Sequence, residues 1–204
     1  MKYQYRKNKG FTLVEMMVAI AVFSIVMVTA MGALLNVIDA NNKARAIKTA
    51  INNISFALEG ITKDMRMGTD YSCSTNGGVS FLGDCTSGGD AIRFKSSKKI
   101  GGVENPYVYY KFSSTTEVQA LELCVGGTTA GSCSDYAAVT SSELNSLTGK
   151  FYILGVAESK NPTPTLRTQP RMIITISGEA GSKEKIRTSF DLQTSLSQVS
   201  RIKI

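Results

Sequence analysis

Histidine and tryptophan are absent from this chain of 204 residues, and proline occurs only four times. Histidine is the side chain that most often acts as a general base and completes many mixed metal sites, so its absence narrows the possible chemistry. The phosphate-binding pattern G-x-x-x-x-G-K-[ST] is also missing. We therefore expect no catalytic residue, no cofactor and no enzymatic activity.

Charge is missing from the twenty positions Met16 to Leu35. Twenty helical residues span about 30 Å, the thickness of the hydrocarbon core of a bilayer. In lipid the backbone must satisfy its own hydrogen bonds, so a single span has to be helical. The sequence therefore predicts a transmembrane helix over 11–38, with one acid, Glu15, just inside its start.

A basic leader, Met1–Gly10, precedes this span and contains no acid. Its four cations account for most of the net charge of +7, since 23 − 4 = 19 basic residues against 16 acidic ones leave +3. The positive-inside rule places the leader in the cytoplasm, which gives an N-in, C-out topology. Three cations after the span weaken this asymmetry without reversing it: Lys43, Arg45 and Lys48.

The apolar run is too long for a conventional secretory signal, whose apolar region covers roughly 7–15 residues. The small residues that could mark signal cleavage, Ala30 and Ala33, lie deep inside the run. No cysteine lies near it, which excludes a lipid-modified cysteine at its end.

The segment Lys9–Glu15, with the sequence KGFTLVE, resembles the cleavage and methylation motif of type IV prepilins and type II secretion pseudopilins. The resemblance is specific over Lys9–Leu35 and only architectural in the C-terminal part. It implies that a membrane-embedded prepilin peptidase cuts after Gly10 and methylates Phe11. It also implies that Glu15, the fifth residue of the mature chain, acts in assembly.

The position of Glu15 can be argued from charge alone. An unpaired carboxylate at the centre of a bilayer costs about 2.5–3.5 kcal/mol on insertion scales. A new α-amino group at Phe11 would lie one helical turn away and could pair with Glu15 of the same or a neighbouring chain. The alternative is that Glu15 reaches the headgroups and has no further role.

The helix is predicted to continue over 39–67 as an amphipathic segment that ends at Gly68. Its apolar seam follows steps of three and four residues: Ala44, Ile47, Ile51, Ile54, Leu58, Ile61 and Met65. We expect this seam to pack on the downstream domain, with a coiled-coil dimer as the weaker alternative.

The region 68–204 is predicted to be a globular, β-rich domain, which gives an α+β fold with a long N-terminal helix packed on an antiparallel sheet. That architecture is also what the pilin resemblance implies. The predicted strands are 91–95, 107–112, 121–125, 151–156, 172–177 and 186–193. A loop is expected over 69–90, with one short strand at 79–82, and a proline-containing loop over 157–170. A hairpin turn is expected at 178–183, and a short helix at 141–147 with Ser141 as its N-cap.

Four cysteines, Cys73, Cys85, Cys124 and Cys133, all follow the span, and disulfides are the natural expectation outside the cytoplasm. Three connectivities are possible, and we favour the local pairs 73–85 and 124–133, each closing a Gly- and Ser-rich loop. A four-cysteine zinc site is the weaker alternative because no C-x-x-C spacing is present. By resemblance to some pilin-like domains Asp84 and Asp90 could help to bind Ca²⁺, but solvated loop acids are favoured, so we expect no metal site.

The resemblance implies a structural subunit of a type IV pilus or type II secretion pseudopilus. It would start in the inner membrane and end in a filament in the periplasm or at the cell surface. The implied partners are the prepilin peptidase, other pilin or pseudopilin subunits, membrane lipid and the inner-membrane assembly platform. A minor, J-like subunit is favoured because the domain is long and rich in strands. Two alternatives stay open: a single-span anchored binding protein that keeps its leader, and a competence pseudopilin for DNA uptake. Nucleic acid is not a favoured partner because the mature charge is nearly balanced.

Overall fold

The computed structural model describes residues 10–113, 120–131, 133–141, 144–156, 169–181 and 184–199. The chain divides into two compact units, Met1–Asn42 and Lys43–Ile204. Helix α1, Leu13–Met67, contributes its first part to one unit and its second part to the other. Two predicted segments, the leader over 1–9 and most of the proline-containing loop, 157–168, lie outside the described residues.

No proline interrupts 13–67, so helix α1 is continuous, and it ends at Met67, directly before the predicted stop at Gly68. The reason for glycine is space, because a Cβ there would lie 2.7 Å from Cδ2 of Phe94. Tyr71 caps the helix end, since its hydroxyl lies against the carbonyl oxygens of Met65 and Gly68, the latter at 2.6 Å.

The second part of α1 buries one narrow face in the core of the second unit. The buried residues are Ala50, Ile54, Ala57, Ile61 and Met65. The predicted seam is therefore only partly right, because Ala44 is exposed and Ile51 and Leu58 are half-buried. Ala50 and Ala57 face the core where Ile51 and Leu58 were expected, because small side chains let a helix approach a sheet closely. The steps of four, three, four and four also follow a straight helix rather than a 3.5-residue repeat.

Nine strands in the described residues form two antiparallel sheets in this unit. The first sheet has the order β1-β3-β4-β5-β6, with β1 Thr69–Ser74, β3 Ala91–Lys95, β4 Tyr107–Phe112, β5 Leu121–Val125 and β6 Ala137–Ala138. The second sheet has the order β2-β7-β8-β9, with β2 Cys85–Gly89, β7 Leu144–Leu154, β8 Arg171–Ala180 and β9 Thr188–Ser197. A short 3-10 helix, η1 Glu184–Ile186, lies between β8 and β9.

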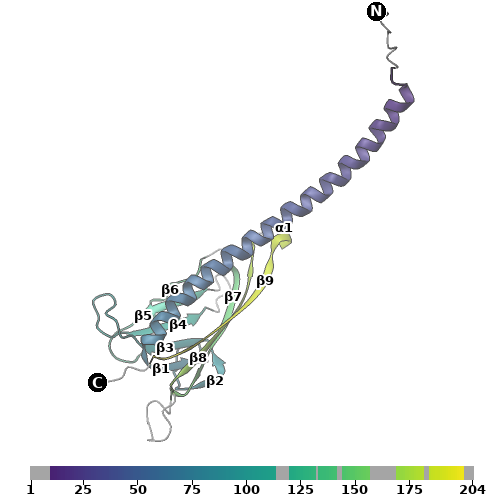
Figure 1. The fold of residues 1–204 in the computed structure, drawn as a ribbon. Coiled ribbons are helices and arrows are strands. Elements are labelled where there is room, and N and C mark those ends of the chain that lie inside the picture. Colours follow the sequence, from purple (N-terminus) through teal and green to yellow (C-terminus); the bar gives the residue numbers. More distant parts are fainter. Residues whose placement is uncertain are drawn as a thin grey trace, which may run out of the picture. The chain divides into compact units, whose positions relative to one another are not determined.

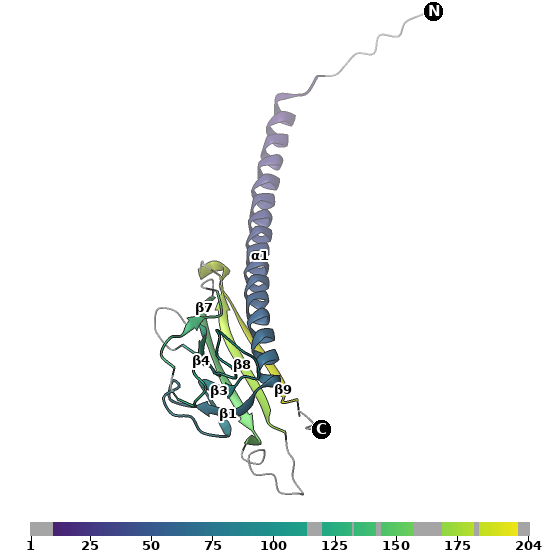
Figure 2. The same ribbon diagram turned by 90° about the vertical axis from the view of Figure 1, so that its left-hand side faces the viewer.

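A single hydrophobic cluster joins the second part of α1 to both sheets. Figures 1 and 2 show the strands gathered beside that part of the helix. The rings of Phe112 on β4 and Phe151 on β7 connect the sheets, with centroids 4.9 Å apart. The predicted α+β class, a long helix packed on antiparallel sheet, is thus confirmed, with two sheets rather than one.

Three strands, β3, β4 and β5, have the predicted bounds, but the loop expected over 69–90 contains β1 and β2. The strand predicted at 79–82 is wrong, because only Leu82 pairs, as an isolated bridge to Cys73. These two strands were not predicted because β1 and β2 contain serine and glycine, which are typical of loops. Their pairing depends on partners that are distant in sequence.

The short helix predicted at 141–147 is also wrong, because β7 begins at Leu144 and Ser141 precedes it. Leu144 and Leu147, spaced like helical neighbours, are both buried because the ladder with β8 shifts register between Leu144 and Ser146.

The hairpin turn predicted at 178–183 lies too early, since β8 continues to Ala180. Gly178 is a site of close approach rather than a turn residue. A Cβ there would lie 2.5 Å from the carbonyl oxygen of Ser146 and 2.7 Å from the ring of Phe190.

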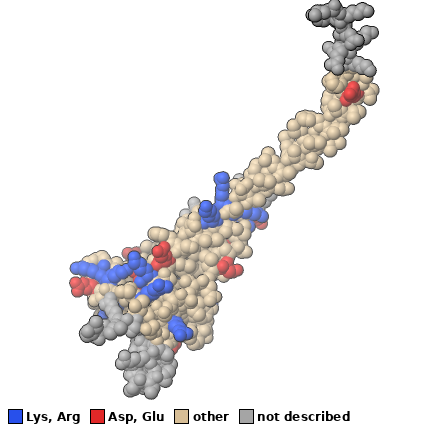
Figure 3. Space-filling view, viewed as in Figure 1, with Lys and Arg blue, Asp and Glu red and all other residues tan. Residues whose placement is uncertain are grey.

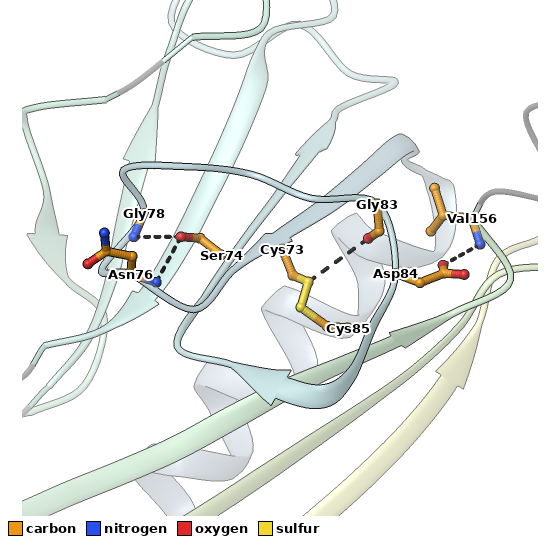
Figure 4. The surroundings of a disulfide bond; sticks show 8 residues. All are labelled: Cys73, Ser74, Asn76, Gly78, Gly83, Asp84, Cys85 and Val156. Atoms are coloured by element: carbon orange, nitrogen blue, oxygen red, sulfur yellow. Dashed lines mark hydrogen bonds between the residues drawn. A yellow bond between two sulfur atoms is a disulfide. The ribbon is translucent and has the colours of Figure 1, made fainter.

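Two disulfides lie in this unit and link Cys73 to Cys85 and Cys124 to Cys133. This is the local pairing favoured by the sequence. Figure 4 shows the first disulfide between β1 and β2, with Ser74 accepting hydrogen bonds from the amides of Asn76 and Gly78. The disulfide therefore closes the loop between β1 and β2, and the Ser74 side chain stabilises the turn inside that loop.

Candidate functional site

The start of α1 is organised by Thr12. The Glu15 amide donates to Thr12 Oγ1 at 3.3 Å, and the Met16 amide donates to the Thr12 carbonyl oxygen at 3.2 Å. Thr12 is thus the N-cap, and its spacing to Glu15 is that of a capping box. The sequence prediction missed this role, although the T-x-x-E pattern is readable in the sequence.

Glu15 lies exposed in the first turn of α1. The helix dipole favours a negative charge at this end. It is the only ionisable side chain between Gly10 and Ile38. Figure 3 shows acidic atoms near the start of this unit and an uncharged surface along most of the rest.

The bond between Gly10 and Phe11 precedes the helix and lies open. Phe11 is 75% exposed, and a Cβ added at Gly10 would have no neighbour within 4 Å. A peptidase could therefore reach this bond without unwinding α1.

The apolar surface after Phe11 is uncovered by the rest of its own unit. From Phe11 to Ile38 the large hydrophobic side chains are 45–75% exposed. Among the residues that the structure describes, one helix, α1, is long and apolar enough to cross a membrane, and its most apolar stretch is not buried. This surface needs lipid or other chains to cover it.

The hydroxyl groups inside the span are satisfied by the helix itself. Ser24 Oγ donates to the carbonyl oxygen of Ile20 at 2.8 Å, and Thr29 Oγ1 donates to that of Val26 at 2.9 Å. Such side chains can enter lipid without a partner. The carboxylate of Glu15 is therefore the one charged side chain in the span, and it needs a partner from outside its own helix.

The other candidate residues have structural roles. Asp84 accepts the Val156 amide at 2.8 Å, and Asp90 accepts the Gly77 amide at 3.0 Å. In the parts of the chain that the structure describes, no three His, Cys, Asp or Glu side chains are grouped to hold a metal ion.

The tyrosines of β4 pack within the sheet. Tyr107, Tyr109 and Tyr110 are at most 7% exposed, so none offers a free ring for stacking on a nucleic-acid base. The Tyr107 hydroxyl donates to Asp70 Oδ2 at 2.5 Å. Burial, together with this hydrogen bond, raises the pKa of Tyr107 to about 12.

Residues 5–31 match the family model of the prokaryotic N-terminal methylation motif. The chain carries the signature of type IV pilins and pseudopilins. The match contains Gly10, Phe11, Thr12 and Glu15, and ends inside the apolar span of this pilin-like chain. Neither the curated proteins nor the solved structures that were compared with the chain gave a match.

The pilin-like architecture extends beyond the matched residues, because the same helix continues into a unit of antiparallel sheets. The motif and the fold therefore point to a pilin-like or pseudopilin subunit with an N-terminal membrane anchor.

Proposed function

We propose that the chain is a minor subunit of a type IV pilus or type II secretion pseudopilus. It is made as a single-pass inner-membrane precursor, N-in and C-out. A prepilin peptidase cuts between Gly10 and Phe11 and methylates the Phe11 amine. The mature chain then leaves the bilayer and joins other pilin or pseudopilin subunits on the inner-membrane assembly platform.

One observation carries this proposal: a methylation-motif match whose apolar helix is exposed and has a lone acid in its first turn, four residues after Phe11. Lipid covers that helix in the precursor, and neighbouring helices cover it in the filament. The Phe11 amine of one chain pairs with Glu15 of the next, so assembly neutralises charges that a bilayer or a filament core would otherwise leave unpaired.

Each part of the chain has a place in this scheme. Residues 1–10 are the leader, 11–38 the membrane and assembly segment, 39–67 its amphipathic continuation and 68–204 the domain that coats the filament. A minor subunit fits a domain of two sheets and two stapled loops better than a compact repeating subunit does.

The test is N-terminal mass analysis after coexpression with a prepilin peptidase. We expect the mature chain to begin at N-methyl-Phe11. An intact Met1 would instead favour the anchored binding protein, and a start near Ala30 would indicate a conventional signal sequence.

Two glycine variants sharpen this test. Gly10→Val should abolish the cut, while Gly32→Ala should leave it unchanged. A Cβ added at either position has no neighbour within 4 Å, so a difference between the variants reports recognition by the peptidase rather than misfolding. Equal cutting of both variants would contradict the assignment of Gly10.

A further inference from the structure

Three exposed cations follow the apolar span on α1: Lys43, Arg45 and Lys48. Residues of a helix are about 100° apart, so Lys43 and Arg45 lie on opposite sides of α1. Asp39 is the only acid from Leu35 to Leu58, so the segment has a net positive charge. Figure 3 shows basic groups gathered along this part of the helix.

The spacing along α1 puts these cations just outside the lipid headgroups when the span is in a bilayer. They follow Leu35 by 43 − 35 = 8, 10 and 13 residues, or about 12, 15 and 20 Å of helix. Each headgroup layer is about 5–8 Å thick, and long basic side chains reach back toward it. The backbone of Lys48 lies about 12 Å beyond that layer, but the Debye length is about 30 Å at 0.01 M ionic strength, so at low salt Lys48 still interacts with the anionic surface.

We propose that Lys43, Arg45 and Lys48 form a basic collar that binds the phosphate groups of anionic phospholipids on the extracytoplasmic face. The inference rests on the N-in orientation given under the proposed function. Opposite charge selects the partner, and the placement of the cations on both sides of the helix allows several lipids to bind at once.

With the collar in place, removal of the leader reverses the charge asymmetry across the span. The precursor has four cations on the cytoplasmic side of its span and the collar on the other side. After the cut only the collar remains, so the asymmetry that set the topology is reversed. The mature chain is then held at the outer headgroups alone and has no basic side chain to carry through the bilayer when it leaves.

The experiment measures lipid selectivity of the full-length protein in symmetric bilayers. Spin-labelled phosphatidylglycerol and spin-labelled phosphatidylcholine are compared as neighbours of the helix at low salt. Each cation near an anionic surface is worth about fivefold in binding. The triple variant Lys43→Gln, Arg45→Gln, Lys48→Gln should therefore lower the preference for phosphatidylglycerol at least about fivefold. High salt should remove most of the difference from the wild type.

A matched control removes three exposed cations elsewhere, Lys63→Gln, Lys99→Gln and Lys150→Gln, and should keep the wild-type preference. The variant Lys43→Arg, Lys48→Arg should also keep it, which separates charge from any effect on folding. Equal loss in the collar and control variants, or no loss in either, would overturn the collar. Both variants retain the leader, so its own attraction for anionic lipid cancels in the comparison.

The collar and the proposed function can fail separately. The lipid assay needs neither a peptidase nor a filament, and the mass analysis at Phe11 needs no anionic lipid. Selectivity that depends on the collar in a chain that is never cut would sustain the collar and reject the proposed processing.

Discussion

At the scale of single residues, Thr12 and Glu15 have different roles at the start of α1: Thr12 caps the helix, and Glu15 places a negative charge in its first turn. The sequence was sufficient to single out Gly10, Phe11 and Glu15, because each departs from what an ordinary membrane anchor needs. Thr12 was missed because its role is visible only as a hydrogen bond to the Glu15 amide. Capping fixes where the helix begins, so Phe11 lies just before the first turn and Glu15 lies within it.

Replacing the acid tests its proposed role. Glu15→Leu should still insert and be cut, because the apolar span and the Gly10–Phe11 bond are unchanged. Its incorporation into filaments should fall at least about tenfold, because an unpaired buried charge costs several kcal/mol and about 1.4 kcal/mol already gives a factor of ten.

Incorporation is measured by quantifying the subunit in sheared or purified filaments. Glu59→Leu is the matched control, since it removes an exposed acid from the same helix outside the span. Normal incorporation of Glu15→Leu would reject the pairing with Phe11.

Tyr107 gives a prediction about pH. Its pKa is raised to about 12 in the folded chain, from 10.0, mainly by burial and further by the hydrogen bond to Asp70. A raised pKa contributes stability that is complete below pH 10 and is lost as pH rises toward 12. The free energy of unfolding should therefore fall over this interval, as measured by denaturant titration. Tyr107→Phe should fall less steeply, and an unchanged slope would contradict the assignment.

At the scale of elements, alternation of apolar and polar residues was sufficient for β3, β4 and β5. It failed for β1 and β2, where Ser, Thr and Gly occupy strand positions next to a disulfide. It also failed at Leu144–Leu147, where a register shift lets two residues three apart share one face. Two positions of the predicted apolar seam of α1 were wrong by one residue, because the small side chains of Ala50 and Ala57 let the helix pack closely.

Two glycines in regular elements should respond in opposite ways to alanine. Gly149 in β7 has no room, since a Cβ would lie 2.5 Å from the Thr175 carbonyl oxygen and would overlap the ring of Phe112. Gly149→Ala should destabilise the fold by about 1–3 kcal/mol, the usual cost of overpacking.

Gly60 in α1 is exposed, and a Cβ added there would have no neighbour within 4 Å. Gly60→Ala should stabilise the chain by up to about 1 kcal/mol through helix propensity. Both values follow from thermal or denaturant unfolding in one buffer. A shift in the same direction for both variants would contradict the packing at Gly149.

At the scale of the whole molecule, the two units differ in where their hydrophobic side chains lie: mostly buried in the second unit and exposed in the first. The buried hydrophobic cluster of the described residues runs from Ala50 to Leu196, inside the second unit. The long exposed apolar surface runs from Phe11 to Ile38, inside the first. The folded core and the exposed apolar surface therefore lie in separate parts of the chain.

A chain that begins at Lys43 should for this reason be monomeric in aqueous buffer and unfold cooperatively with both disulfides formed. The full-length chain should need detergent. Light scattering, intact mass and thermal melting check this expectation. Association of the shortened chain, or a melt without a cooperative transition, would show that residues before Lys43 complete the core.

The end of α1 makes hydrogen bonds with Tyr71 on β1 and with the residues that follow β9. Beside the cap from Tyr71, the Val199 amide donates to the Arg66 carbonyl oxygen at 3.0 Å, and Gln198 Nε2 donates to that of Gly68 at 3.0 Å. Tension on the helix during withdrawal from a bilayer would thus be shared between the first and last strands, instead of passing only through the backbone at Gly68. A pulling force on α1 would therefore not act on β1 alone, and the sheets would not open from that strand.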